Sequence, residues 1–187
     1  MKLTEKVHSV LLQHLSLGDC AVDMTAGNGW DTLFLSKSVG ESGHIFSFDI
    51  QKAAIAQTKK LMSEAQQTSN LTLFHSCHTK IEQKIPPSFY QKVKAITFNL
   101  GYLPTSNKTI ITTPQSTLCA LEKSYEWMAQ DGVMTILAYR GHSGGLEEAQ
   151  TITEWTNRVP VHHEVIMGNE SPKSPVLYII KKSERIL

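Results

Sequence analysis

The sequence has few cysteines and few aromatic residues, and its positive and negative charges nearly balance. Three cysteines in 187 residues, an odd number without CxxC spacing, are most simply interpreted as reduced thiols and disfavour a zinc site. We therefore expect reduced thiols and no bound metal. Lysine and arginine exceed aspartate and glutamate by only 18 to 17, which excludes a general polyanion binder. A local basic face would still suit the phosphates of a nucleic acid.

Long apolar runs are also absent, which limits where the protein is expected to work. No run approaches the roughly 18 to 20 residues that cross a bilayer. The residues after Met1 lack the apolar core of a secretory signal. We expect a cytoplasmic protein with no membrane partner. The length suits one buried core, so residues 1–187 are predicted to form a single domain.

Short apolar, β-branched runs alternate along the chain with stretches of helical periodicity, which predicts an α/β protein with a mostly parallel sheet. Strands are expected at 20–25, 44–49, 71–76, 93–100, 133–139, 161–167 and 176–181. Helices are expected at 4–15, 30–39, 52–65, 113–129 and 146–157, with Thr4 as an N-cap and a turn at Asp131 and Gly132. The last two strands leave no room for a helix between them, so we expect a C-terminal antiparallel hairpin. This Rossmann-like, seven-stranded arrangement with helices on both faces resembles the class I methyltransferases.

A glycine loop follows the first expected strand. Gly27 and Gly29 allow a sharp turn and a close approach of the backbone to a ligand. Thr32 stands where the dinucleotide fingerprint has a third glycine or an alanine, which disfavours a nicotinamide cofactor. Asp23 lies inside the strand, and in S-adenosylmethionine enzymes such a buried acid orients the loop and the cationic methionine end. An ordinary turn between a strand and a helix is the alternative.

Asp49 ends the second expected strand, 20 residues after Gly29. A carboxylate at this edge of the sheet is placed to accept both ribose hydroxyls of a nucleoside, and it could also cap the next helix. His78 follows the third strand, where it would lie beside the adenine or form a polar rim. Together these features predict S-adenosylmethionine as the cofactor. The residues predicted to bind it are Asp23, Thr25, Ala26, Gly27, Asn28, Gly29, Asp31, Thr32, Asp49, Ile50, Gln51, His78 and Asn99.

The chemistry is indicated by the segment after the fourth expected strand, Phe98-Asn99-Leu100-Gly101-Tyr102-Leu103-Pro104. It resembles the Asn/Asp-Pro-Pro-Tyr motif of enzymes that methylate amine nitrogens, with Gly101 in place of a proline. The attacking amine must lose a proton, and acceptors about 3 Å from its nitrogen would orient it. The Asn99 amide and the Leu100 carbonyl are the predicted acceptors, and Tyr102 is a stacking surface. Asn99, Gly101 and Tyr102 are the predicted catalytic residues; a strand end followed by a simple turn is the alternative.

The substrate side is less sharply defined by the sequence. No cysteine lies close to the end of the fourth strand, so methylation of nitrogen is favoured over a cysteine-nucleophile mechanism on carbon. No convincing general base stands out, and His142 and Tyr102 are candidates by position only. The loop 169–175 would border the substrate mouth or simply turn the chain. The residues predicted to bind substrate are Tyr102, Leu103, Pro104, Tyr139, Arg140 and His142, although Arg140 and His142 would also suit a solvated loop.

Four motifs resemble one family of small methyltransferases, which carries the name rRNA methylase. Residues 21–35 are close to its D-A-T-A-G-N-G-x-D-T-x-F-L signature, and residues 99–104 match its N-L-G-Y-L-P. Residues 139–142 resemble Y-P-G-H with Arg140 in place of proline, and residues 174–177 resemble P-P-F-L. The resemblance covers essentially the whole chain.

What the resemblance implies is N-methylation of the aminomethyl group of 5-aminomethyl-2-thiouridine at wobble position 34 of tRNA. The partner would then be a tRNA anticodon stem-loop. An unpaired anticodon base suits recognition by stacking and loop shape, without a large basic surface. Methylation of rRNA or of a small-molecule amine, and a cofactor-binding module without catalysis, are the alternatives. Either a monomer or a homodimer is compatible with the sequence.

Overall fold

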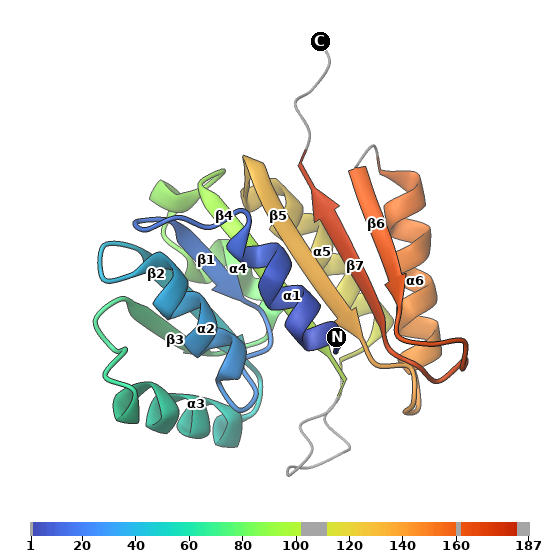
Figure 1. Ribbon diagram of the computed structural model, residues 1–187, viewed down its shortest axis with the longest axis horizontal. Helices are drawn as coiled ribbons and strands as arrows, with labels where there is room; N and C mark the ends of the chain where they lie inside the picture. The colour runs from blue at the N-terminus through green and yellow to red at the C-terminus, as the bar shows by residue number, and fades with distance from the viewer. Residues whose placement is uncertain (1, 102–111, 160–161, 183–187) are drawn as a thin grey trace.

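The computed structural model describes residues 2–101, 112–159 and 162–182. Its centre is a seven-stranded sheet with the strand order β3-β2-β1-β4-β5-β7-β6 (Figure 1). The strands are β1 (Cys20–Asp23), β2 (His44–Asp49), β3 (Leu71–His75), β4 (Val93–Leu100), β5 (Met128–Ala138), β6 (His162–Met167) and β7 (Val176–Lys181). Strands β1 to β5 run parallel to one another, while β7 pairs antiparallel with both β5 and β6. The predicted fold class, including the C-terminal hairpin, is confirmed.

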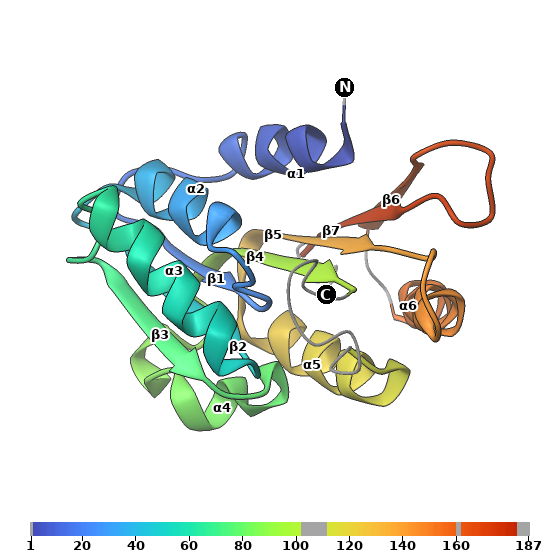
Figure 2. The same ribbon diagram turned by 90° about the horizontal axis from the view of Figure 1, so that it is seen from below.

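Helices cover both faces of the sheet, as Figure 2 shows. On one face lie α1 (Leu3–Leu12), α2 (Trp30–Val39) and α3 (Lys52–Glu64), and on the other lie α4 (Ile81–Lys84), α5 (Pro114–Trp127) and α6 (Gly145–Arg158). Side chains alternate along a strand, so each inner strand supplies both cores. Ala21 packs with α1 and α2, whereas its neighbours Cys20 and Val22 pack with the core on the α5 and α6 side. Burial on both faces explains why these strands are almost continuously apolar.

The strand register places the functional loops. Asp23, the last residue of β1, is paired with Ser47 of β2 and with Thr97 of β4. Both neighbouring strands therefore continue at least two residues beyond the end of β1. Their side chains at that level, Asp49 and Asn99, flank the glycine loop from its two sides.

Several predicted boundaries and caps are wrong, each for a local reason. Lys2 rather than Thr4 is the N-cap of α1, because the Glu5 carboxylate accepts a hydrogen bond from the Lys2 backbone N–H at 3.1 Å. Asp131 and Gly132 lie within β5, where an irregular register against β4 absorbs the expected turn. Between β3 and β4 the chain forms two 3-10 turns, η1 (His78–Lys80) and η2 (Pro87–Phe89), and the short α4. These elements are shorter than the window in which periodicity is visible.

Within the described ranges, no helix has both the length and the apolar character needed to cross a membrane.

The core that supports the glycine loop is open to a direct test. Leu35 of α2 is fully buried, whereas Leu12 at the end of α1 is 57% exposed. We expect Leu35→Ala to lower the free energy of unfolding by about 2–5 kcal/mol, because it leaves a cavity between α2 and the sheet. The matched Leu12→Ala should change it by less than about 0.5 kcal/mol. Urea unfolding measures both, and equal losses would contradict this placement of the core.

Candidate active site

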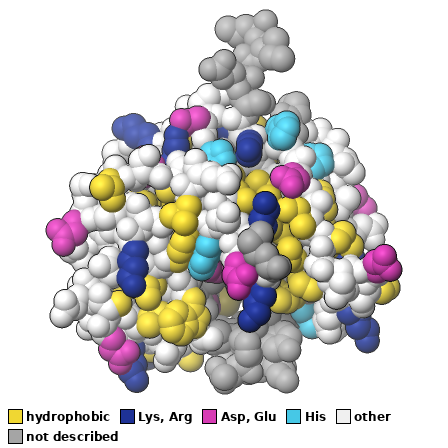
Figure 3. Space-filling view, viewed as in Figure 1, with side chains coloured by type: hydrophobic (Ala, Val, Ile, Leu, Met, Phe, Trp, Pro, Cys, Tyr) yellow, Lys and Arg dark blue, Asp and Glu magenta, His cyan; other side chains and the backbone are white. Residues whose placement is uncertain are grey.

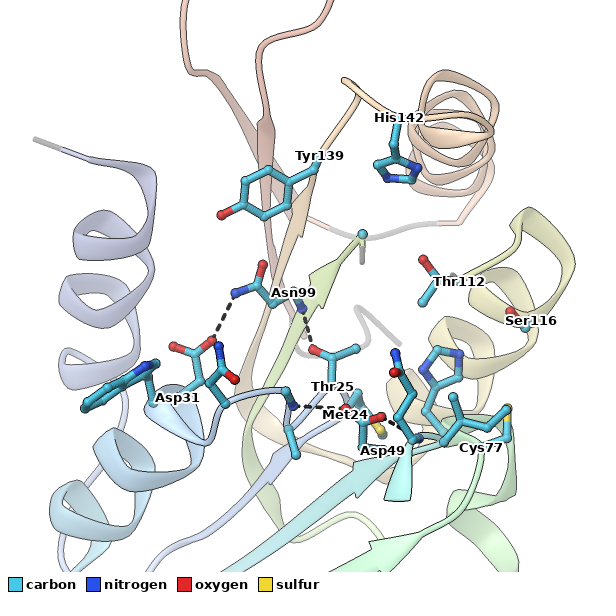
Figure 4. A pocket seen from close by; sticks show the side chains of 18 of the residues that line it. Met24, Thr25, Asp31, Asp49, Cys77, Asn99, Thr112, Ser116, Tyr139 and His142 are labelled. Carbon is cyan, nitrogen blue, oxygen red and sulfur yellow. Dashed lines mark hydrogen bonds between the residues drawn. The ribbon is translucent and has the colours of Figure 1, made fainter. Parts of the chain in front are cut away.

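A cavity of about 520 Å³ opens at the carboxyl ends of β1, β2 and β4 (Figure 4). Open α/β sheets bind their ligands where the strand order reverses, and here that point lies between β1 and β4. The predicted site residues that line the cavity are Thr25, Ala26, Gly27, Asn28, Asp31, Asp49, Ile50, Gln51, His78, Asn99, Gly101, Tyr139 and His142. Tyr102, Leu103 and Pro104 lie outside the described residues. Most of the predicted site is therefore brought together at one edge of the sheet.

The glycine loop needs its glycines for two different reasons. Gly27 and Gly29 have φ angles of +53° and +87°, a region that residues with a Cβ rarely adopt. A Cβ on Gly29 would also lie 3.0 Å from Cα of Thr58 in α3. Thr58 in turn donates a hydrogen bond from its hydroxyl to the Gly27 carbonyl at 3.2 Å. Gly29 itself therefore faces α3, and its contribution to the cavity is the shape of the loop.

Asp23 supports the loop from beneath and does not line the cavity. Its buried carboxylate accepts hydrogen bonds from the Thr25 backbone N–H at 3.0 Å and from the Thr32 hydroxyl at 2.6 Å. Burial, followed by the negative charge of Asp31, raises the pKa of Asp23 to about 7. Asp23 and Thr32 were both predicted to bind the cofactor, and the structure places both behind the loop.

Asp49 connects the end of β2 to the glycine loop. Its carboxylate accepts the Gly27 backbone N–H at 2.9 Å and the Gln51 backbone N–H at 2.8 Å, the latter at the start of α3. Burial raises the pKa of Asp49. A carboxylate has about four acceptor positions, so these two bonds leave capacity for hydroxyl groups in the cavity. Capping and ligand binding are thus compatible in the same side chain.

Asn99 is held on two sides at the end of β4. Its backbone N–H donates to the Thr25 hydroxyl at 2.7 Å, and its Nδ2 donates to Oδ2 of Asp31 at 3.3 Å (Figure 4). The other Asp31 oxygen, Oδ1, is 2.7 Å from Nε2 of His8 in α1. The predicted second acceptor, the Leu100 carbonyl, is already used by the Tyr139 backbone N–H at 3.1 Å, and Leu100 is buried. One acceptor position of this carbonyl is therefore used in the pairing with the end of β5, and its role as a substrate acceptor stays a prediction.

The opposite end of the cavity contains His78 and Cys77. His78 is 7% exposed, and within the described residues its Nε2 has no hydrogen-bond partner. Burial lowers the pKa of this imidazole. Cys77 lines the cavity well away from Asn99 (Figure 4), so no thiol lies at the end of β4. His78 therefore lines this end of the cavity as a buried polar ring.

Arg140 was predicted to bind substrate, but it does not line the cavity. Its Nε donates to the Ser174 carbonyl at 2.6 Å, and a terminal nitrogen donates to the Ser171 carbonyl at 3.2 Å. The guanidinium thus holds the loop between β6 and β7, and Lys173 of that loop reaches the cavity. A position of loop 169–175 at the border of the substrate mouth was one of the two alternatives given by the sequence.

Other lining residues were not predicted, namely Met24, Trp30, Ser76, Thr112, Ser116 and Gly141. Thr112 is fixed from a distant element, since its hydroxyl donates to the buried Glu148 of α6 at 2.9 Å. Thr113 and Ser116 form the N-terminal cap of α5, a signal that the sequence does contain. Among the described side chains, no group of three or more His, Cys, Asp or Glu residues could hold a metal ion.

Substitution of two glycines separates backbone strain from close packing. Gly29→Ala should destabilise the protein more than Gly144→Ala, because the backbone is left-handed at both but only Gly29 is crowded by Thr58. Gly144 has a φ of +81° with no atom near its Cβ position. Gly144→Ala should therefore lower the free energy of unfolding through backbone strain alone, on the order of 1–2 kcal/mol. The midpoints of thermal unfolding give the comparison. If both variants lost the same stability, the contact between the loop and α3 would be unimportant.

Comparisons with known proteins agree with this geometry. The family described as "Putative rRNA methylase" matches residues 45–181. A chloroplastic tRNA (mnm(5)s(2)U34)-methyltransferase from Arabidopsis thaliana is 36% identical over 98% of this chain and 70% of its own length.

Two solved structures cover nearly the whole chain. A crystal structure from Clostridium thermocellum that carries the same description as the family has a TM-score of 0.89 and 34% identity, over 97% of this chain and 98% of that one. A Streptococcus mutans protein described as a "putative methyltransferase", in complex with SAH, has a TM-score of 0.82 and 29% identity, over 96% of this chain and 97% of that one. The family predicted from the sequence motifs is confirmed. The chain belongs to the rRNA methylase family and, with it, to the S-adenosylmethionine-dependent methyltransferases.

Proposed function

We propose that this protein methylates the aminomethyl nitrogen of 5-aminomethyl-2-thiouridine at wobble position 34 of tRNA, using S-adenosylmethionine. The observation that carries the proposal is the position of Asn99. Its backbone N–H is bonded to the glycine loop and its side chain to Asp31, at the edge of a cavity large enough for a nucleoside cofactor. The name of the Arabidopsis relative supplies the substrate, and the amide at the end of β4 supplies the matching chemistry.

The cavity fits S-adenosylmethionine in size and in its polar groups. Its volume of about 520 Å³ lies within the range of about 300–1,000 Å³ that ligand pockets span. We assign the ribose hydroxyls to Asp49 and the adenine end to Ile50 and His78. The loop 25–29 would hold the methionine end. Asp23 and Thr32 keep that loop in shape from behind.

The cofactor, when bound, supplies an electrophilic methyl group on a positively charged sulfur. The residues of the chain must present a neutral amine to that group and keep it in line. The Asn99 amide oxygen is a suitable acceptor, because Nδ2 is directed to Asp31 and the oxygen points toward Tyr139 (Figure 4). Fixing the amine in one orientation removes much of the entropic cost of the reaction.

The cavity mouth suits a single unpaired nucleotide. Tyr139 is 38% exposed and offers an aromatic face, while Lys173 and His142 lie on the same rim. On the face shown in Figure 3, basic and acidic side chains are interspersed and form no large patch of one sign. Single-stranded RNA is read by stacking and by the shape of the loop, so an extended basic surface is not required. We infer that the anticodon stem-loop enters at this rim.

The compartment and the assembly state are part of the proposal. The name of the Arabidopsis relative assigns that protein to the chloroplast. For this chain we propose a cytoplasmic location, and a monomer or homodimer that acts on tRNA.

Transfer of label to tRNA tests the function directly. Incubated with methyl-labelled S-adenosylmethionine and bulk tRNA from a strain lacking this gene, the protein should label one nucleoside, the methylaminomethyl form of the wobble uridine. Nuclease digestion and chromatography identify that nucleoside. Bulk rRNA and a small-molecule extract are the parallel substrates. Label only in rRNA or only in the small-molecule pool, or in none of the three, would contradict the proposal.

Two variants separate cofactor binding from chemistry. Asn99→Ala should keep the affinity for S-adenosylmethionine but lower kcat by about 100-fold, because the amine loses its acceptor. Asp49→Ala should show the reverse, with Kd raised by about 10- to 100-fold through loss of charged hydrogen bonds. Calorimetry gives the affinities, and thermal unfolding checks that both variants fold. A loss of affinity in Asn99→Ala equal to its loss of rate would refute the assigned role.

A further inference from the structure

We propose that Asp31 is the proton acceptor of the reaction and that His8 positions its carboxylate. The inference rests on the proposed function, because it takes the substrate to be an aliphatic amine. It also assigns the base that the sequence motifs leave unidentified. Asp31 was expected to bind the cofactor; we now place it against the substrate.

The chemistry requires a proton acceptor near Asn99. An aliphatic amine is largely protonated near neutral pH and has no lone pair in that form. One N–H bond must therefore break, with the proton passing to a base and the electron pair staying on nitrogen. That pair then forms the new bond to the methyl carbon, and the electrons of the broken carbon–sulfur bond remain on sulfur. An amide cannot take the proton, so Asn99 alone does not suffice.

The position of Asp31 meets this requirement. It lies at the start of α2, lines the cavity, and is joined through Oδ2 to Nδ2 of Asn99 at 3.3 Å. A carboxylate only accepts hydrogen bonds, so this contact turns the Asn99 oxygen away from Asp31 and toward the cavity. An amine bound to that oxygen would be next to Asp31 (Figure 4). The same negative charge would also attract the incoming ammonium group.

His8 restrains the carboxylate from the opposite side. Its Nε2 is 2.7 Å from Oδ1 of Asp31, while Oδ2 is the oxygen on the Asn99 side. The His8 ring is stacked on Phe34, with centroids 3.8 Å apart and planes inclined by 4°. The side chain of His8 is 32% exposed and that of Asp31 18%, so the pair lies between the cavity and solvent. A proton taken up by Asp31 therefore has a short route to water after the product leaves.

The other ionisable groups that face Asp31 are less suited to accept this proton. Asp23 of β1 is fully buried behind the loop, with its pKa raised to about 7 by burial and by the charge of Asp31. Tyr139, which follows β5, has its pKa raised by burial and by Asp31, so its phenol keeps its proton near neutral pH. His142 lies farther along the rim, with Nδ1 2.9 Å from the Ser143 carbonyl (Figure 4). Its contribution is tested below.

The pH dependence of the rate distinguishes a base from an orienting group. In wild type on aminomethyl tRNA, Asp31 removes the proton at neutral pH. Asp31→Asn should lower kcat by about 100-fold at pH 7. Its rate should then climb by about tenfold per pH unit, because solvent removes the proton instead. Asn99→Ala should lose a constant factor at every pH. His142→Gln should keep the shape of the wild-type profile.

A second pair of variants tests the positioning role of His8. His8→Leu should lower kcat by about tenfold with little change in KM, and His8→Gln, which keeps a hydrogen-bond donor, should recover part of the loss. His14→Leu is the control, since His14 lies beside Lys94, Lys181 and Asp131, outside this cluster. It should retain the wild-type rate.

The affinity for S-adenosylmethionine, measured by calorimetry without tRNA, distinguishes a role of Asp31 in proton transfer from a role in cofactor binding. Asp31→Asn should bind the cofactor as wild type does. A loss of affinity that accounts for the loss of rate would overturn the assignment, as would a pH-independent loss in Asp31→Asn or the rising profile in His142→Gln. If wild type itself failed to label aminomethyl tRNA, the proposed function would fall first.

Discussion

The site depends on the hydrogen bond between the Gly27 backbone N–H and the Asp49 carboxylate. This bond joins the loop after β1 to the end of β2, and Thr25 joins the same loop to Asn99 at the end of β4. Three neighbouring strands are thereby connected at the edge where the sheet order reverses. The shape of the loop is therefore fixed from both sides by bonds within the chain. Preorganisation of this kind lowers the cost of binding and of reaction.

The two ends of the cavity differ in the chemistry that they favour. At one end lie Asp49 and His78, to which we assign the nucleoside part of the cofactor. At the other, Asn99 and Asp31 place an amide and a carboxylate side by side, next to the exposed ring of Tyr139. A neutral acceptor and a negative charge together suit a group that arrives as an ammonium ion and must react as an amine. This pairing supports the proposed methylation of an amine nitrogen over that of a carbon atom.

The sheet and the glycine loop could be predicted because their signals are local. Short apolar runs between helical stretches predict the strands. The spacing of Gly27, Gly29 and Asp49 predicts the cofactor loop. The pairing of His8 with Asp31 could not, because it depends on how α1 packs beside α2 across 23 residues of sequence. The hydrogen bond from Thr112 to Glu148 could not be predicted for the same reason, because it joins residues that are far apart in the sequence.

Some errors arose from residues whose chemistry suits two tasks. Arg140 was expected to bind substrate or to lie in a solvated loop, yet its guanidinium donates hydrogen bonds to the carbonyls of Ser171 and Ser174. An arginine next to a flexible loop fits either role in a sequence, and only the fold decides between them. The bond from the Tyr139 backbone N–H to the Leu100 carbonyl could not be foreseen either, because it depends on how β4 and β5 pair. Roles on the substrate rim are therefore less predictable than the cofactor loop.

The central claim is that the methyl group goes to an exocyclic amine nitrogen. The most direct measurement uses an anticodon stem-loop with a ¹⁵N-labelled aminomethyl group and S-adenosylmethionine with a ¹³C-labelled methyl group. We predict a methyl carbon signal that is split by one-bond coupling to ¹⁵N. A transferred methyl group without that coupling would place it on another atom, and would contradict the account.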